Sequence, residues 1–130
     1  MKTYWDSSAL IEAIEDPAIR GRIKPGDNAT RSHALSELFS TLTKGANYRY
    51  SPADAAAMIA DLKTDMTFVD LTADEMLDAI NRASSLGVRG ARIHDLMHAW
   101  AAKKWQADVL LTLDRSGFST LKVPVKIEEP

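Results

Sequence analysis

The feature that most limits the fold of this chain is the apolar run from Val109 to Leu113. A strand with one face in water alternates apolar and polar residues, whereas this run presents apolar side chains to both faces. It therefore predicts a strand in a parallel sheet that is covered by helices on both sides. A fold of this kind needs further strands separated by helices, and the rest of the chain supplies them.

Four more segments are predicted as strands. They are Lys2 to Trp5, Asn28 to Arg31, Met66 to Val69 and Val123 to Ile127, of which the second is the weakest. Segments with apolar residues at helical spacing lie between them, which predicts right-handed crossovers and a mainly parallel sheet. The expected fold class is α/β, a three-layer α/β/α sandwich.

The predicted helices have recognisable starts at Ser32, Ser51 and Thr72. Each of these residues has a side-chain oxygen that can cap a first turn. The first of the three helices has an apolar face at helical spacing, formed by Leu35, Leu38, Phe39 and Leu42. A further helix is predicted from Ile93 to Trp105.

The composition fits one domain over residues 1–130, with no linker or internal repeat. The absence of cysteine excludes disulfides and thiolate metal sites and fits a reducing cytoplasm. The formal net charge of −2 excludes a general polyanion binder. No signal peptide is expected, because the charged Asp6 comes so early, and no apolar run is long enough to span a membrane.

Two aspartates are predicted at the sheet edge where active sites of such folds lie. Asp6 follows the first strand and Asp114 follows the Val109–Leu113 strand, so both lie at carboxyl ends. Asp70 also follows a strand and is a rival on position alone. Any one such aspartate could instead be a helix cap or a turn residue.

Two further acids lie on helices among small residues. Asp95 is opposite the apolar stripe of its helix and beside Ala99 and Ala102, where a solvated helix usually has Lys or Glu. Glu37 points away from the apolar face of its own helix. Small neighbours suggest that another part of the chain packs closely against each carboxylate, although each acid alone could be an ordinary surface residue.

If these four acids converge, two like charges about 4 Å apart repel by roughly 4 kcal/mol at an effective dielectric near 20. A fold tolerates such a cluster only with protons, basic partners or cations nearby. Oxygen ligands without cysteine favour Mg²⁺ or Mn²⁺ over Zn²⁺. Carboxylate clusters with such ions are used to hydrolyse phosphodiesters.

The chain resembles the PIN-domain family, and within it the VapC-type toxins of bacterial and archaeal toxin–antitoxin pairs. The resemblance runs from Tyr4 to Phe118 through motifs that occur in the family's order. These are Tyr4-Trp5-Asp6-Ser7-Ser8-Ala9-Leu10, Ser36-Glu37-Leu38, Ile93-His94-Asp95-Leu96-Met97-His98-Ala99, and Thr112-Leu113-Asp114 with Phe118. Family members often carry another acid just before that phenylalanine, where this chain has Gly117.

The resemblance implies a ribonuclease that binds one or two Mg²⁺ or Mn²⁺ ions. The implied metal ligands are Asp6, Glu37, Asp95 and Asp114. Ser8 and Thr112 resemble the hydroxyls that orient water or carboxylates around the metal, and they complete the implied catalytic set. His94 and His98 are interpreted as surface or packing residues rather than as ligands.

The resemblance also implies partners: an RNA substrate, an antitoxin protein and a second copy of the chain in a homodimer. Two alternatives stay open, a housekeeping RNA-processing PIN nuclease and a non-catalytic PIN-like interaction module. Tyr48, Arg49 and Tyr50, in a turn between two helices, offer stacking and charge suited to unpaired bases. They equally suit a partner-binding surface.

Overall fold

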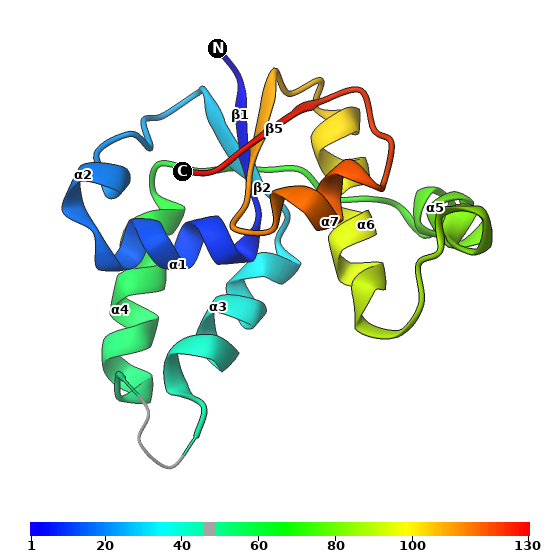
Figure 1. Cartoon of the computed structure of the whole chain (residues 1–130). Coiled ribbons are helices and arrows are strands. Elements are labelled where there is room, and N and C mark those ends of the chain that lie inside the picture. Colours follow the sequence, from blue (N-terminus) through cyan, green and yellow to red (C-terminus); the bar gives the residue numbers. More distant parts are fainter. Residues whose placement is uncertain (46–48) are drawn as a thin grey trace.

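A computed structural model describes residues 1–45 and 49–130 and shows helices on both faces of a five-stranded sheet (Figure 1). The strands are β1 (Thr3–Trp5), β2 (Asn28–Thr30), β3 (Thr67–Phe68), β4 (Val109–Leu111) and β5 (Lys126–Glu128). Their order is β3-β2-β1-β4-β5, and every pairing of neighbours is parallel. This confirms the predicted α/β/α sandwich with a parallel sheet.

Helices fill the connections between the strands. They are α1 (Ser7–Glu15), α2 (Pro17–Arg20), α3 (His33–Thr43), α4 (Pro52–Lys63), α5 (Ala73–Leu86), α6 (Ile93–Lys104) and α7 (Arg115–Ser119), with a 3-10 turn at Gly90–Arg92. Figure 1 shows α1, α2 and α4 to one side of the sheet and α5 and α6 to the other. Among the described residues, no helix is both long enough and apolar enough to cross a bilayer.

The two faces of the sheet belong to two separate layers of the core. Side chains of a strand alternate between its faces, so Tyr4 and Leu110 pack in the layer formed with α5 and α6. Trp5, Val109 and Leu111 pack in the opposite layer, with α1, α3 and α4. All five side chains are buried, so β1 and β4 are covered on both sides as the apolar run predicts.

Some local expectations differ from the structure. The strand expected to reach Leu113 ends at Leu111, and Leu113 is 48% exposed. Ser32 makes no side-chain cap on α3, because its hydroxyl donates instead to Asp70 Oδ2 at 2.7 Å. Phe39, expected on the buried face of α3, is 40% exposed. The short helix α7 is absent from the sequence prediction.

Burial on both faces makes β4 the strand most sensitive to truncation. Leu110→Ala removes a fully buried side chain, and we expect a loss of about 2–5 kcal/mol in the free energy of unfolding. Leu113→Ala, at an exposed position close by, is the matched control and should change the stability by less than about 0.5 kcal/mol. Urea denaturation followed by circular dichroism measures both. Equal losses would contradict the assignment of the core.

Candidate active site

The central pair of strands brings two parts of the sequence to one edge of the sheet. Trp5 of β1 is in register with Leu111 of β4, and the backbone N–H of Asp6 donates to the carbonyl of Leu111 at 3.1 Å. Asp6 and Thr112, the next residues along each strand, therefore lie next to each other where the strands end. This is the sheet edge at which the sequence places the site.

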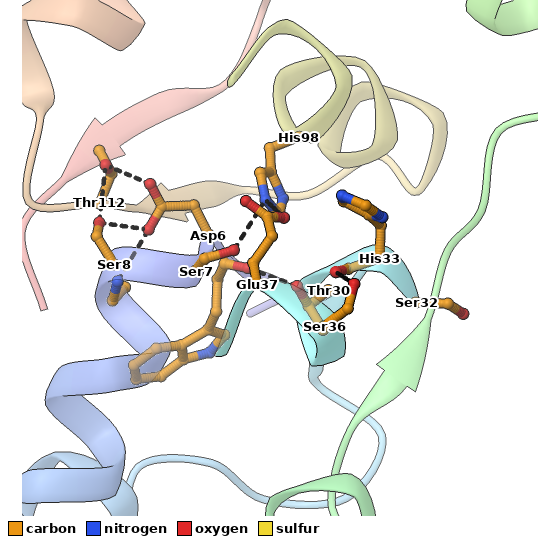
Figure 2. A network of polar contacts seen from close by, with 12 residues as sticks. Asp6, Ser7, Ser8, Thr30, Ser32, His33, Ser36, Glu37, His98 and Thr112 are labelled. Atoms are coloured by element: carbon orange, nitrogen blue, oxygen red, sulfur yellow. Dashed lines mark hydrogen bonds and ion pairs between the residues drawn. The ribbon is translucent and has the colours of Figure 1, made fainter. Parts of the chain in front are cut away.

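The carboxylate of Asp6 is buried and fixed by hydrogen bonds to both oxygens (Figure 2). Oδ1 accepts from the Ser8 hydroxyl at 2.7 Å and from the backbone N–H of Ala9 at 2.9 Å. Oδ2 accepts from the Thr112 hydroxyl at 2.6 Å. Asp6 is thus the N-cap of α1 and also the centre of a hydroxyl network, so the two interpretations of this residue do not exclude each other.

Asp114 is connected to the same network through Thr112. The Thr112 hydroxyl oxygen accepts from the backbone N–H of Asp114 at 3.0 Å. The exposed carboxylate of Asp114 folds over the start of α7, where its Oδ1 accepts from the backbone N–H of Gly117 at 3.1 Å. A Cβ at position 117 would lie 2.2 Å from Asp114 Oδ2. The glycine at 117 is therefore what lets Asp114 take this position.

Glu37, on α3, meets His98 of α6 (Figure 2). Its Oε1 lies 3.1 Å from Nε2 of His98, and the Ser7 hydroxyl is 3.2 Å from the same nitrogen. Burial of the half-buried carboxyl would raise the pKa of Glu37, but the hydrogen bond and the charge of His98, with help from the Ser7 hydroxyl, outweigh it and lower that pKa. Glu37 is therefore an ionised, oriented carboxylate.

His98 lies in the candidate site, where the sequence analysis did not place it. It is fully buried, and its Nδ1 lies 2.7 Å from the hydroxyl of Tyr4. The interpretation as a surface or packing histidine leaves out its contact with Glu37. The sequence does show that His98 comes one helical turn after Asp95, and this spacing places both side chains on one face of α6.

Asp95, in the first turn of α6, is half-buried and lies close to other acids. Burial raises the pKa of Asp95, and the charge of Asp6 raises it further. His98 and Arg92 oppose this rise, while Asp114 adds to it. The Nε of Arg92 is 4.0 Å from Asp95 Oδ2. Asp6 and Asp114 are thus near enough to Asp95 to disfavour its ionisation.

Tyr4 connects the fourth acid to this group. Burial raises the pKa of Tyr4 above its usual range, and the charges of Asp6 and Glu37 add to that rise. Within residues 1–45 and 49–130, however, no three acid or histidine side chains are close enough to hold one metal ion in the positions described. The four acids therefore influence one another's charge, but in the described positions they do not form a complete set of metal ligands.

The remaining candidates lie elsewhere. Asp70 is exposed at the end of β3, and hydrogen bonds from the hydroxyl and backbone N–H of Ser32 lower its pKa. Tyr48 lies outside the described residues. Arg49 forms an ion pair with Glu15 of α1, so its charge is already neutralised by a partner.

The strand order and the acidic carboxyl edge define a PIN-like α/β/α domain. Solved structures match the chain over nearly its whole length. VapBC2 from Rickettsia felis, bound to a DNA fragment from their promoter, matches with a TM-score of 0.72 and 15% identity, over 100% of this chain and 99% of that chain. DNA-bound VapBC from Salmonella typhimurium matches with a TM-score of 0.73 and 20% identity, over 99% and 98%.

A third solved structure, PAE2754 from Pyrobaculum aerophilum, has a TM-score of 0.73 and 20% identity, over 97% of this chain and 89% of that chain. No family model matches the sequence, and no curated protein sequence matches it. Likenesses at 15–20% identity show the fold, and they confirm that it is PIN-like.

The contact between Gly117 and Asp114 gives a test of the site geometry. In Gly117→Ala the new methyl group displaces the Asp114 carboxylate from the first turn of α7. We expect a loss of about 1 kcal/mol in stability, as for a lost helix cap. Thermal unfolding measures the loss. Asp114→Ala is the partner variant, and adding Gly117→Ala to it should cost little more; full additivity would contradict the cap.

Proposed function

We propose that this chain is a Mg²⁺- or Mn²⁺-dependent ribonuclease that acts in the cytoplasm as the toxin of a VapBC-type toxin–antitoxin pair. The observation that carries the proposal is the geometry at the carboxyl edge of the sheet, where the buried carboxylate of Asp6, held by the hydroxyls of Ser8 and Thr112, lies next to the strand end that carries Asp114. Acids that crowd together need protons, basic partners or cations nearby, and burial and the charge of Asp6 raise the pKa of the neighbouring Asp95. The fold shared with solved VapBC complexes supports the same function.

The donor chemistry of the site fits the proposed ion. Asp6, Glu37, Asp95 and Asp114 offer carboxylate oxygens, and Ser8 and Thr112 offer hydroxyls, which are the ligand types that Mg²⁺ and Mn²⁺ prefer. No three of the described acids are close enough to share one ion as they stand, so an ion bound by three of them would need at least one side chain to rotate. The half-buried Asp95 and the exposed Asp114 have the most freedom to do so.

In the proposed mechanism the side chains of the protein hold the carboxylates in place, and the bound ion would supply positive charge. Ser8 and Thr112 fix the carboxylate of Asp6 in one orientation, and Asp114 is anchored beside it by the same threonine. A bound divalent ion would activate water and stabilise the leaving oxygen of the RNA backbone. Asp95, on α6, completes the negative surface that recruits the ion.

The proposed partners are an RNA substrate, an antitoxin and a second copy of this chain. The matched structures include complexes named VapBC, two of them with DNA, which supports a protein partner for this fold. An antitoxin segment that inserts an arginine would neutralise the carboxylates by charge-assisted hydrogen bonds. Light scattering of the purified chain, alone and co-expressed with the product of the adjacent gene, tests the homodimer and the complex.

The second candidate is a non-catalytic PIN-like interaction module. It is favoured by the lack of a preassembled metal group among the described residues and by Gly117 in place of an acid. A housekeeping RNA-processing nuclease would share the chemistry and differ in its substrate. Incubation with a mixed RNA pool and Mn²⁺ separates an enzyme from a module, and growth arrest on expression separates a toxin from a housekeeping nuclease.

Cleavage should depend on the acids of the cluster. We expect Asp95→Asn and Asp6→Asn each to lower RNA cleavage by orders of magnitude, because each removes one negative charge and one ligand oxygen. Asp70→Asn is the matched control, since Asp70 also ends a strand but its carboxylate accepts hydrogen bonds from Ser32. Rates are measured on labelled RNA with Mn²⁺. Loss of activity in Asp70→Asn together with full activity in Asp95→Asn would contradict the assignment of the site.

Without metal, Asp95→Asn and Asp6→Asn should have different effects on the stability of the fold. The pKa of Asp95 is raised in the folded state, so its ionisation opposes folding as the pH rises above the ordinary value of 3.8. Asp95→Asn therefore leaves the melting temperature at pH 7 unchanged or higher. Asp6→Asn lowers it, because an amide nitrogen cannot accept the hydrogen bond that one carboxylate oxygen accepts. Thermal unfolding of the wild type and both variants in the presence of a chelator measures these changes.

A further inference from the structure

His98 forms a buried chain of hydrogen bonds that joins three elements of the fold. The Tyr4 hydroxyl of β1 lies 2.7 Å from its Nδ1, and Glu37 Oε1 of α3 lies 3.1 Å from its Nε2. Tyr4 and His98 are both fully buried, so water does not compete for these groups. Any buried histidine needs polar partners for its ring nitrogens, and here one of the partners is the carboxylate of Glu37 in the candidate site.

The neighbours of His98 decide which nitrogen carries a proton. A carboxylate can only accept, so a hydrogen on Nε2 is the arrangement that suits its contact with Glu37 Oε1. The hydroxyl of Tyr4 can donate as well as accept, so it can donate to Nδ1. The order of donation is then Tyr4 to His98 to Glu37. The alternative tautomer would set the bare Nε2 against a carboxylate oxygen.

We propose that His98 is a positioning residue for Glu37: it binds Oε1 and so leaves Oε2 as the oxygen that faces a divalent ion. This inference rests on the proposed function and extends it to a residue that is not itself a ligand. A carboxylate with one oxygen held by a fixed donor presents its other oxygen in a defined direction. Asp6 is also held by neighbouring donors, with Ser8 on Oδ1 and Thr112 on Oδ2.

The position of His98 on α6 gives this contact a second consequence. Asp95 and His98 are one turn apart on the same helix. The helix that contributes one acid therefore also orients the acid on α3. Hydrogen-bond partners of metal-binding carboxylates typically contribute about 10- to 100-fold in metal affinity, which sets the size of the expected effect.

The test is the affinity of the purified full chain for Mn²⁺, measured by isothermal titration calorimetry without RNA. The main variant is the double substitution Tyr4→Phe, His98→Leu, which removes both buried polar groups together and so leaves no tyrosine hydroxyl without its histidine partner. We expect its dissociation constant for Mn²⁺ to rise by about 10- to 100-fold. His98→Gln, whose amide can still donate to Glu37, should restore most of the affinity.

His94→Leu is the matched control on the same helix. His94 is exposed and stacks on His33 with ring centroids 5.5 Å apart, and the control variant should bind Mn²⁺ like the wild type. Metal-free melting curves of all variants show whether each one is folded. If the double variant fails to fold, His98→Gln and His98→Asn give the same comparison, because Asn is too short to reach Glu37.

A double-mutant cycle separates positioning from general packing. In a Glu37→Gln background, removing the His98 contact should cause no further loss of Mn²⁺ affinity, because the carboxylate on which it acts is gone. An equal loss in both backgrounds would overturn the proposal. Unchanged affinity in the wild-type background would overturn it as well. A wild-type chain that binds no Mn²⁺ would instead remove the metal site of the proposed function, and this inference with it.

The proton position gives a readout that does not depend on metal. NMR of ¹⁵N-histidine-labelled protein distinguishes the two ring nitrogens of His98. We expect a proton on Nε2 in the metal-free wild type and an altered Nε2 signal in Glu37→Gln. A proton on Nδ1 alone would overturn the assigned order of donation, whatever the affinity measurements give.

Discussion

The hydrogen bond from Thr112 to Asp6 is the contact on which the geometry of the acidic edge depends. It joins residues that are 106 positions apart in the sequence, and both side chains are buried. The same hydroxyl oxygen accepts from the backbone N–H of Asp114. One threonine therefore uses its single donor and one acceptor site to fix the acids that follow β1 and β4.

That contact matters because the acids repel one another. Hydrogen-bond donors hold three of the acids: hydroxyls for Asp6, an imidazole for Glu37 and a backbone N–H group for Asp114. The fourth acid, Asp95, has the guanidinium of Arg92 4.0 Å away. A buried cation lies near the site as well, since Arg31 lowers the pKa of both Tyr4 and Asp70 and its Nη1 finds no hydrogen-bond partner within the described residues. A positive charge is thus kept close to both Tyr4 and Asp70.

The sequence predicted the sheet and its acidic edge because both follow from local rules. Apolar runs mark buried strands, and a residue directly after a parallel strand lies at its carboxyl end. The role of His98 did not follow, because its partners are 94 and 61 positions away and helical spacing shows only which face a residue occupies. In the sequence, Gly117 is noticeable only because family members often have an acid at this position. That its lack of a side chain makes room for the Asp114 carboxylate depends on the backbone geometry.

The small residues beside Asp95 connect the prediction to the packing. Ala99 and Ala102 are fully buried, as are most residues of α6 from Leu96 onward. Side chains of this size let a helix approach a sheet closely, and a close approach is what brings the imidazole of His98 within reach of Tyr4. The alanines that first suggested tight packing around an acid thus also account for the buried donor that holds Glu37. Packing and charge at this edge therefore depend on the same face of one helix.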